Sequence, residues 1–314
     1  MNDDTNPTAW ERGVLERLLQ GTLIEQRRAR RWRIFFRLLS VLLVLLVLGV
    51  FVSDVGVPQV NSRHTALVQL NGVIAPGTDA NADLIIESLR AAYDNTHVAG
   101  VVLRIDSPGG SPVQAGRINA EIQRLRGLHP TVPLYAVIDD ICASGGYYVA
   151  VAADKIYADK ASVVGSVGVL MNGFGFVGAM EKLGIERRLL TAGEHKGFLD
   201  PFSPQNPEDA DHARELLKAI HGQFIAVVKQ GRGARLKDDP RLFSGLVWTG
   251  EQGIELGLVD ALGDTDSVAR DVFKADKVVD YTVRPAYFEK LIRSAGGEAA
   301  SSLLNALSDG LRWR

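Results

Sequence analysis

The sequence predicts an α/β fold with a mostly parallel sheet and flanking helices, preceded by one N-terminal transmembrane helix. From residue 66 onward, short apolar runs typical of buried strands alternate with longer amphipathic stretches typical of helices. Glycine-rich breaks follow two of these apolar runs, as expected where a chain leaves a sheet. Upstream lies one long apolar segment with a single charge. No internal repeat is evident, so we expect one α/β domain.

The upstream apolar segment covers residues 34–52, and its only charge is Arg37 near one end. At about 1.5 Å per residue, a helix of this length spans about 28 Å, close to the hydrocarbon thickness of a bilayer. The Arg37 side chain can reach the interface from its position. A buried core helix would carry polar residues along one face, and here only Ser40 does so. We therefore predict a transmembrane span that contacts the lipid bilayer.

Arginine is concentrated on one side of this span. Six arginines lie between residues 27 and 37, and the next basic residue after the span is Arg63. The positive-inside rule therefore places residues 1–33 in the cytoplasm and the chain from about residue 54 outside. The long basic region and the missing small-x-small cleavage site favour a signal anchor over a cleaved signal peptide. Residues 10–33 could lie on an anionic leaflet as an amphipathic helix or extend the span.

The first half of the domain follows the alternating pattern closely. The apolar segment 66–74 predicts a strand, and the valine-rich run 98–106 predicts a buried strand. Between them, residues 83–93 carry apolar side chains at helical spacing. After a break at SPGGS, residues 112–127 show the same spacing and end near a glycine.

The second half continues with strands, a loop and helices. A strand over 133–139 leads into a glycine turn and a helix. Further strands are expected at 154–158, 163–170 and 186–191, followed by a loop rich in Pro and Asp and a long helix over 207–231. The segment 248–263 predicts a helix closed by Gly257, and a last helix, a strand and helices complete the chain.

Composition limits the class of protein. The 314 residues are 46% hydrophobic, which is enough for a substantial core. The net charge of −2 gives no argument for a nucleic-acid partner. Cys142 is the single cysteine, so an intramolecular disulfide is impossible, and its place after an apolar strand predicts a buried side chain rather than a thiol nucleophile. No Cys/His cluster indicates a metal, and we expect no cofactor.

Ser144 stands at the tip of the glycine turn, in ASGG. It could cap the following helix through its side-chain oxygen. It could equally be an exposed nucleophile, placed where flanking glycines let a substrate backbone come close. Locally the two interpretations are nearly even.

A second glycine break, DSPGGS at 106–111, strengthens the catalytic interpretation. Sites in open α/β sheets lie beyond the carboxyl ends of strands, and both breaks fall there. An acyl-transfer site needs two backbone N–H groups aimed at the developing oxyanion. Gly145 could supply one, and Gly109 or Gly110 the other. Taken alone, SPGG would be a simple turn.

A nucleophilic serine also needs a base. After Ser144 the first histidine is His195, and Lys196 follows it. A lysine acts as a base only when burial or a positive neighbour favours its neutral form, and nearby apolar residues could provide that burial. This reasoning leaves three alternatives open: Lys196 as the base, His195 as the base, or no catalytic role for either residue. The other five histidines are expected to be unremarkable: His64 just past the span, and His97, His129, His212 and His221 in or beside polar helix ends.

Five motifs occur in order along the chain. They are DSPGG at 106–110, ASGGYYVAVAADKI at 143–156, GSVGV at 165–169, GEHK at 193–196 and WTGEQGIELGLVD at 248–260. Each is weak alone, but the five together closely resemble the signal peptide peptidase A family of membrane-anchored bacterial serine peptidases. The resemblance runs over about residues 66–280, and it implies a Clp-protease/crotonase-like fold with a Ser/Lys dyad.

The resemblance also implies roles for individual residues. By motif match, Ser144 is the nucleophile and Lys196 the general base. Ser166 matches a hydroxyl that helps to orient the lysine, and Gly109 and Gly145 match the oxyanion donors. His195 departs from the family pattern, in which an aromatic residue often precedes the lysine. A Ser/His hydrolase that uses His195 therefore stays an alternative.

Substrate, assembly and location follow from the same resemblance. It implies hydrolysis of remnant signal peptides and similar apolar peptides by a homo-oligomer, an octamer, in which a neighbouring subunit can supply the lysine. It implies a single-pass protein of the bacterial inner membrane, with the catalytic domain on the periplasmic, extracytoplasmic side. The expected parts are a cytoplasmic segment 1–33, the anchor 34–52, a linker 53–65, the peptidase domain 66–285 and a C-terminal helical extension 286–314.

Three other interpretations are weaker. GFGFVG at 173–178 matches a dinucleotide fingerprint, but its phenylalanines would crowd a pyrophosphate. An acyl-CoA enzyme of crotonase type would have no use for an exported domain behind an anchor. A non-catalytic membrane scaffold of the same fold would not need Ser144 and Lys196 together.

Overall fold

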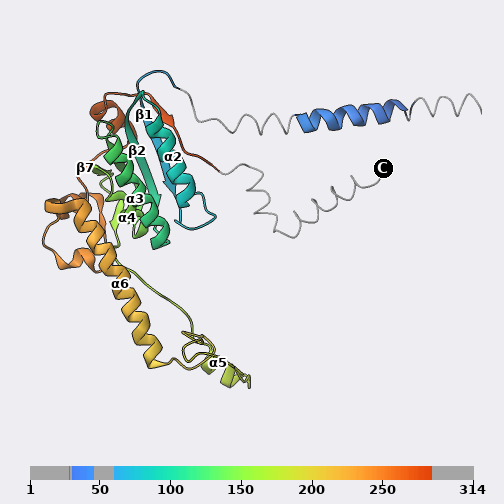
Figure 1. Cartoon of the computed structure of the whole chain (residues 1–314), viewed down its shortest axis with the longest axis vertical. Coiled ribbons are helices and arrows are strands. Elements are labelled where there is room, and N and C mark those ends of the chain that lie inside the picture. The colour runs from blue at the N-terminus through green and yellow to red at the C-terminus, as the bar shows by residue number, and fades with distance from the viewer. Residues whose placement is uncertain (1–27, 29, 46–59, 285–314) are drawn as a thin grey trace, which may run out of the picture. The chain divides into compact units, whose positions relative to one another are not determined.

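The computed structural model describes residues 28, 30–45 and 60–284 of the chain. Residues 60–284 belong to one compact unit, and residues 30–45 form a helix (Figure 1). In these ranges, no helix is both long and apolar enough to cross a membrane. The predicted span 34–52 extends past them, because residues 46–52 lie outside the described residues. The span stays a prediction, as does the C-terminal extension 286–314, which also lies outside.

One mixed sheet forms the centre of the compact unit. Its strands run in the order β6 (Val247–Thr249), β5 (Val163–Gly165), β3 (Leu134–Ala143), β2 (Val98–Ser107), β1 (His64–Asn71) and β8 (Val278–Asp280). β4 (Lys155–Ala158) pairs with β3 and with β7 (Ala261–Leu262) beside this path. All of these pairs are parallel except β5 with β6. The predicted α/β fold with a mostly parallel sheet is therefore confirmed.

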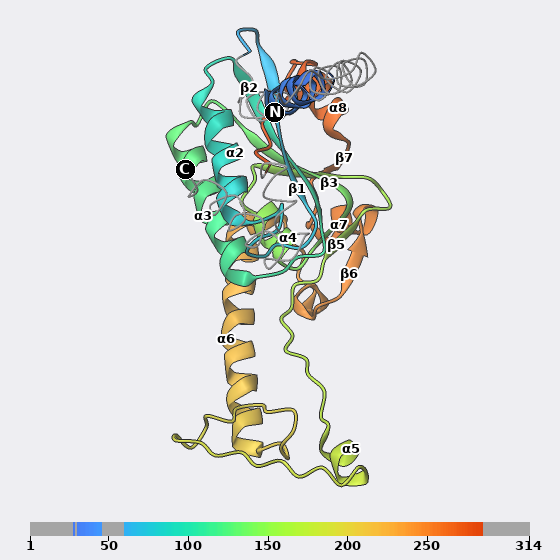
Figure 2. The same ribbon diagram turned by 90° about the vertical axis from the view of Figure 1, so that its right-hand side faces the viewer.

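Helices α2 (Ala82–Asp94), α3 (Pro112–Leu128) and α4 (Gly145–Ala150) lie side by side on one face of the sheet (Figures 1 and 2). The remaining helices are α5 (Val177–Lys182), α6 (Pro207–Arg232), α7 (Gly250–Leu256) and α8 (Thr265–Ser267), with 3-10 turns at Gly233–Arg235 and Pro240–Phe243 and a π turn at Val268–Val272. The predicted helices 83–93, 112–127 and 207–231 are confirmed. The predicted end at Gly257 is also confirmed, since this glycine caps α7 with φ 77°.

Alternation along the central strands divides the core between the two faces. Val101, Leu103 and Ile105 of β2 lie in the cluster beneath the helices, whereas Val102 contacts a smaller cluster on the other face. Phe273 belongs to that second cluster and packs so closely on Gly100 that a Cβ there would lie 2.6 Å from its ring. Both faces are therefore covered, as parallel sheets require.

Strand β3 changes partner halfway along its length. Its first half pairs with β4 from Tyr135 to Ile138, and its last residues, Ile141 to Ala143, pair with β5. The register with β2 shifts at the same place. The β3 end that carries the Ser144 turn is therefore placed between β2 and β5.

Residues after β5 leave the sheet. The segment 169–206, which we call the arm, includes α5 and lies at the far end of α6, away from the sheet (Figure 2). The predicted strand 163–170 is therefore shorter than expected, and the predicted strand 186–191 is wrong. Its apolar side chains, such as Leu190, are exposed, because the arm brings no other strand beside them.

The C-terminal end of α6 is fixed to the body by a buried ion pair. Arg232, with a side chain 1% exposed, donates to the Gly257 carbonyl at 2.8 Å and to both Asp260 carboxylate oxygens at 2.7 and 3.0 Å. Burial acts to raise the pKa of Asp260, but the Arg232 hydrogen bond and charge lower it more, so the pKa lies below its usual range.

Replacing Arg232 with methionine should lower the free energy of unfolding by up to about 3 kcal/mol, because the partly buried Asp260 carboxylate then depends on the Ile156 N–H and the exposed Arg235 guanidinium, 3.3 Å away, as partners. Since the folded-state pKa of Asp260 is depressed, the pair stabilises fully above the unfolded value of about 3.9 and loses its effect as the pH falls through the folded value. Urea unfolding of the full chain should therefore show that the difference in the free energy of unfolding between wild type and Arg232→Met becomes smaller in acid. Arg117→Met, at an exposed pair with Asp83, is the control and should cost under about 1 kcal/mol. If Arg232→Met and Arg117→Met lowered the free energy of unfolding by the same amount, the prediction would be contradicted.

Candidate active site

Three neighbouring strands end at the same edge of the sheet. In register, Ser107 of β2 lies beside Cys142 of β3, and Ala143 of β3 lies beside Gly165 of β5. The glycine loop after β2, the Ser144 turn after β3 and Ser166 after β5 are consequently brought together. The expectation that the two glycine breaks stand at adjacent strand ends is confirmed.

Ser144 has a backbone conformation that L-residues rarely adopt, with φ 50° and ψ −120°. Its N–H donates to the Gly165 carbonyl at 2.9 Å, and its carbonyl accepts from Tyr148 N–H at 2.9 Å. The side chain is partly exposed and makes no capping bond to α4, so the helix-cap interpretation is wrong. Strain of this kind persists only where the surrounding structure imposes it, and it is common at active sites.

Gly109 lets the loop after β2 approach the Ser144 turn. It has φ 102°, and a Cβ at this position would lie 2.6 Å from the Gly145 nitrogen and 2.7 Å from the Ser144 Cβ. No larger residue fits without displacing the turn. The loop itself is held by a parallel bridge to Ile74, since Ile74 N–H donates to the Gly109 carbonyl at 2.8 Å.

The N–H groups around Ser144 differ in availability. Gly109 N–H donates to the Ser107 hydroxyl at 3.1 Å and is therefore occupied. In the part of the chain that the structure describes, the N–H groups of Gly110 and Gly145 donate to no protein group. The two glycines are close neighbours, because a Cβ on Gly145 would lie 3.2 Å from the Gly110 nitrogen.

Ser166 shares the unusual conformation of Ser144, with φ 52°. Its N–H donates to the Leu246 carbonyl at 2.8 Å, and the Trp248 side chain packs against the preceding Gly165. Gly165 in turn accepts from Ser144 N–H. The turn of Ser166 is thus joined directly to the turn of Ser144.

Lys196 is not brought to this edge within one chain. It is exposed and lies in the arm, in a loop next to the first turn of α6. By contrast, α6 contacts α4 much further along, where Phe224 packs on Tyr148 at 5.2 Å between ring centroids. About 22 Å of helix separates that contact from the first turn. The arm residues therefore provide Lys196 with no burial of the kind that the sequence suggested.

Two histidines lie in unexpected places. His221 was predicted near a polar helix end, but it stands within α6, and its Nε2 lies 3.1 Å from the Val167 carbonyl, next to Ser166. His64 is buried at the start of β1, with Nε2 2.9 Å from the Tyr281 hydroxyl. Neither position could be recognised from composition, since each depends on a partner far along the chain.

Cys142 lies in β3, two residues before Ser144, and is fully buried. Burial raises the pKa of its thiol, which keeps the sulfur protonated and unreactive. The expectation of a buried, non-nucleophilic cysteine is confirmed.

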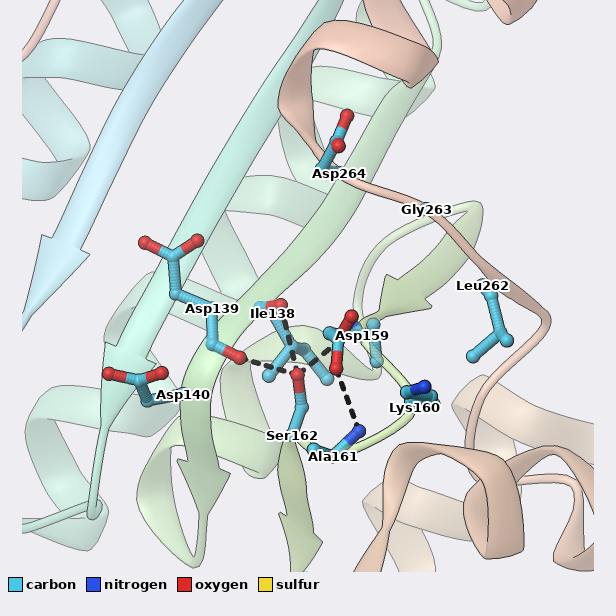
Figure 3. Close-up of a pocket in the computed structure, with 11 residues that line it drawn as sticks. Ile138, Asp139, Asp140, Asp159, Lys160, Ala161, Ser162, Leu262, Gly263 and Asp264 are labelled. Atoms are coloured by element: carbon cyan, nitrogen blue, oxygen red, sulfur yellow. Dashed lines mark hydrogen bonds between the residues drawn. The ribbon is translucent and has the colours of Figure 1, made fainter.

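A cavity of about 480 Å³ opens beside the middle of β3, where this strand changes its pairing from β4 to β5 (Figure 3). Its lining includes the carboxylates of Asp139, Asp140, Asp159 and Asp264, together with Lys160. Ser162 also lines the cavity and donates to the Asp139 carbonyl. None of the predicted site residues lines it, and the described residues contain no His, Cys, Asp and Glu cluster suited to a metal ion. The cavity is therefore separate from the Ser144 edge.

Comparison with known proteins gives one family match and several related sequences. Residues 128–279 match peptidase family S49. The chain is 42% identical over 224 residues to a Brucella melitensis protein named Na(+)/H(+) antiporter NhaA, covering 70% of this chain but only 30% of that protein. It is 31% identical to Synechocystis sp. slr0021, which carries the name of a protease, over 66% of this chain and 72% of the relative. It is 29% identical to an Enterococcus faecium protein named for signal peptide peptidase SppA, over 71% of this chain and 67% of that protein.

The family match and the Synechocystis relative place the chain in a family named for peptidases. The chain belongs to peptidase family S49.

Proposed function

We propose that this chain is a serine endopeptidase of Clp-protease/crotonase-like fold, with Ser144 as nucleophile and Lys196 as general base. The observation that carries the proposal is the Ser144 turn. A hydroxyl free of capping bonds stands on a strained turn, and unpaired backbone N–H groups lie beside it. A nucleophile next to two convergent donors is the arrangement that acyl transfer requires.

The proposed reaction uses these groups in sequence. Neutral Lys196 takes the Ser144 proton, and the alkoxide attacks a peptide carbonyl. Gly145 N–H and a second glycine N–H stabilise the tetrahedral oxyanion. The charged lysine protonates the leaving amine, and water then hydrolyses the acyl-enzyme with the same lysine as base. For the second donor, the unpaired N–H of Gly110 is favoured over Gly109, whose N–H is occupied by Ser107.

Ser166 is proposed to orient the lysine through its hydroxyl. The support is its position, since its turn is joined to Ser144 through the Gly165 carbonyl and its backbone has the same rare conformation. This role places the incoming lysine amine between Ser144 and Ser166.

The lysine is proposed to come from a neighbouring copy in a homo-oligomer, an octamer. The support is twofold: Lys196 lies in the arm, remote from its own Ser144, and the arm exposes large apolar side chains that a second copy could cover. The most exposed are Leu190 at 96%, Phe174 at 82%, Leu170 at 78% and Leu183 at 72%. Burial by a neighbour would also favour the neutral amine that a base requires.

The proposed substrates are apolar peptides such as remnant signal peptides. The name of the Enterococcus faecium relative and the apolar arm support this class. We further propose that residues 34–52 anchor the protein in the bacterial inner membrane, with the catalytic domain on the extracytoplasmic side.

Peptide cleavage by the full chain in detergent or vesicles tests the proposal. An apolar signal-peptide-like fluorogenic peptide should be cleaved with a kcat/KM at least about 10-fold above that of a polar peptide of equal length, because each buried methylene adds about 0.8 kcal/mol of transfer free energy. A serine-directed acylating reagent should block turnover and label Ser144. If the folded chain cleaved neither peptide and took up no label, the non-catalytic membrane scaffold would replace the peptidase.

A further inference from the structure

The loop that carries Lys196 is fixed to α6 by the side chain immediately before the lysine. His195 Nδ1 lies 2.7 Å from Asp209 Oδ1. Asp209 stands on the first turn of α6 and is only 7% exposed, although the arm around it is open. One turn further along, His212 contacts the edge of the Phe198 ring at 5.8 Å between centroids.

Backbone bonds alone do not hold this loop on the helix. Within it, Lys196 N–H donates to Gly193, Phe198 N–H to His195 and Asp200 N–H to Gly197, each only three residues back. Such bonds shape a turn but do not place it relative to α6. The side-chain contacts to Asp209 and His212 are therefore what connect Lys196 to the helix, and α6 is in turn connected to the body of the domain.

The charges near the lysine give this contact a second consequence. Asp209 on α6 contacts His195 directly, Glu194 in the loop and Glu208 on α6 act on it through their charge, and His212 lies on the next turn of the helix. A carboxylate that paired with the Lys196 ammonium would favour the charged lysine and so oppose its use as a base. The His195 imidazole occupies Asp209 instead. Consistent with this pairing, the hydrogen bond and charge of Asp209 raise the pKa of His195.

We infer that His195 is a positioning residue: its bond to the buried Asp209 carboxylate fixes the lysine loop to α6 and keeps that carboxylate from pairing with Lys196. The inference rests on the proposed role of Lys196 as base.

Peptide turnover by the full chain as a function of pH tests the inference. His195→Phe keeps a ring but loses the bond to Asp209, so kcat/KM at pH 7 should fall about 10-fold, mainly in kcat. The acid limb of the profile should move about one pH unit upward, since Asp209 becomes free to pair with the lysine. His195→Asn, whose amide can take the place of Nδ1, should stay within about 3-fold of wild type.

A double variant and two controls separate the possible explanations. In His195→Phe combined with Asp209→Asn, the acid limb should return toward its original pH while part of the kcat loss remains. His97→Phe, at an exposed histidine outside the arm, should leave activity unchanged. Thermal unfolding of each variant identifies any that fail to fold. If His195→Phe is one of them, His195→Asn is compared with wild type instead.

The outcomes separate this inference from the proposed function. If Lys196→Ala is inactive but His195→Phe keeps the activity and pH profile of wild type, the positioning role is wrong and the Ser/Lys mechanism stands. If Lys196→Ala stays active while His195→Asn and His195→Phe are equally inactive, His195 is itself the base, and both proposals are wrong.

Discussion

Replacing Ser144 with glycine should abolish peptide cleavage and at the same time stabilise the fold. Loss of the nucleophile should lower kcat by about 10⁴-fold or more. The φ of 50° at Ser144 costs an L-residue about 1–3 kcal/mol, and glycine carries no such strain. The serine side chain makes no capping bond that the substitution would remove. Glycine also gives the unfolded chain more conformational entropy, which offsets part of this gain. The free energy of unfolding should therefore rise by about 1 kcal/mol in total.

Two matched variants make this result specific. Ser144→Ala removes the hydroxyl but keeps the Cβ, so it should be equally inactive with nearly unchanged stability. Ser162→Ala should behave in the opposite way, because Ser162 is buried and donates to the Asp139 carbonyl. It should lose about 1–2 kcal/mol of stability and keep its turnover. Urea unfolding and turnover of an apolar peptide measure the two quantities, and a Ser144→Gly chain that cleaves like wild type would contradict the nucleophile assignment.

Much of the fold could be predicted from the sequence because local signals and packing agree. Helix α6 begins where Asn206 caps its first turn and Pro207 follows, and it ends at Gly233. Strands β1 and β2 are largely apolar and buried along most of their length, as expected for parallel strands covered on both faces. The glycine breaks at the ends of β2 and β3 could be assigned to one site because adjacent parallel strands end at the same edge.

The arm could not be predicted because several of its large apolar side chains, such as Leu190 and Phe174, are exposed rather than packed on the sheet. Leu189 and Leu190 suggested a strand at 186–191, yet a strand needs a neighbour to satisfy its backbone, and the arm offers none. Long-range contacts were equally hidden: Asp209 is paired with His195 of the arm, and His221 with Val167 after β5. The residues themselves predicted Ser144 and Lys196 as candidates for one site, whereas their separation within one chain depends on the arm and could not be read from local patterns.

That separation predicts complementation between two inactive variants. Ser144→Ala and Lys196→Ala should each lose activity by about 10⁴-fold when expressed alone. When the two full-length chains are coexpressed in equal amounts, a Lys196→Ala chain still carries Ser144, and a neighbouring Ser144→Ala chain can supply its lysine. Activity should therefore reappear in the mixed oligomer.

The size of the recovery follows from the arrangement. In a closed ring, each site takes its serine from one chain and its lysine from the next. With random mixing, half of the chains keep the serine and half of their neighbours keep the lysine, so about one quarter of the sites should be complete. Turnover per chain should thus recover to about 25% of wild type, measured on the same apolar peptide after purification through tags on both variants.

A matched mixture tests whether recovery needs an exchange between copies. Replacing the Ser144→Ala chain by one with both Ser144→Ala and Lys196→Ala leaves no lysine in the mixture, and activity should disappear. If the original mixture also stays inactive while its chains associate, each subunit must use its own lysine. The arm would then have to fold back over the Ser144 edge of its own chain, which requires α6 to bend or detach from α4, where Phe224 now contacts Tyr148. Recovery near one quarter would instead mean that the extended arm is the catalytic arrangement, with the neighbour completing each site.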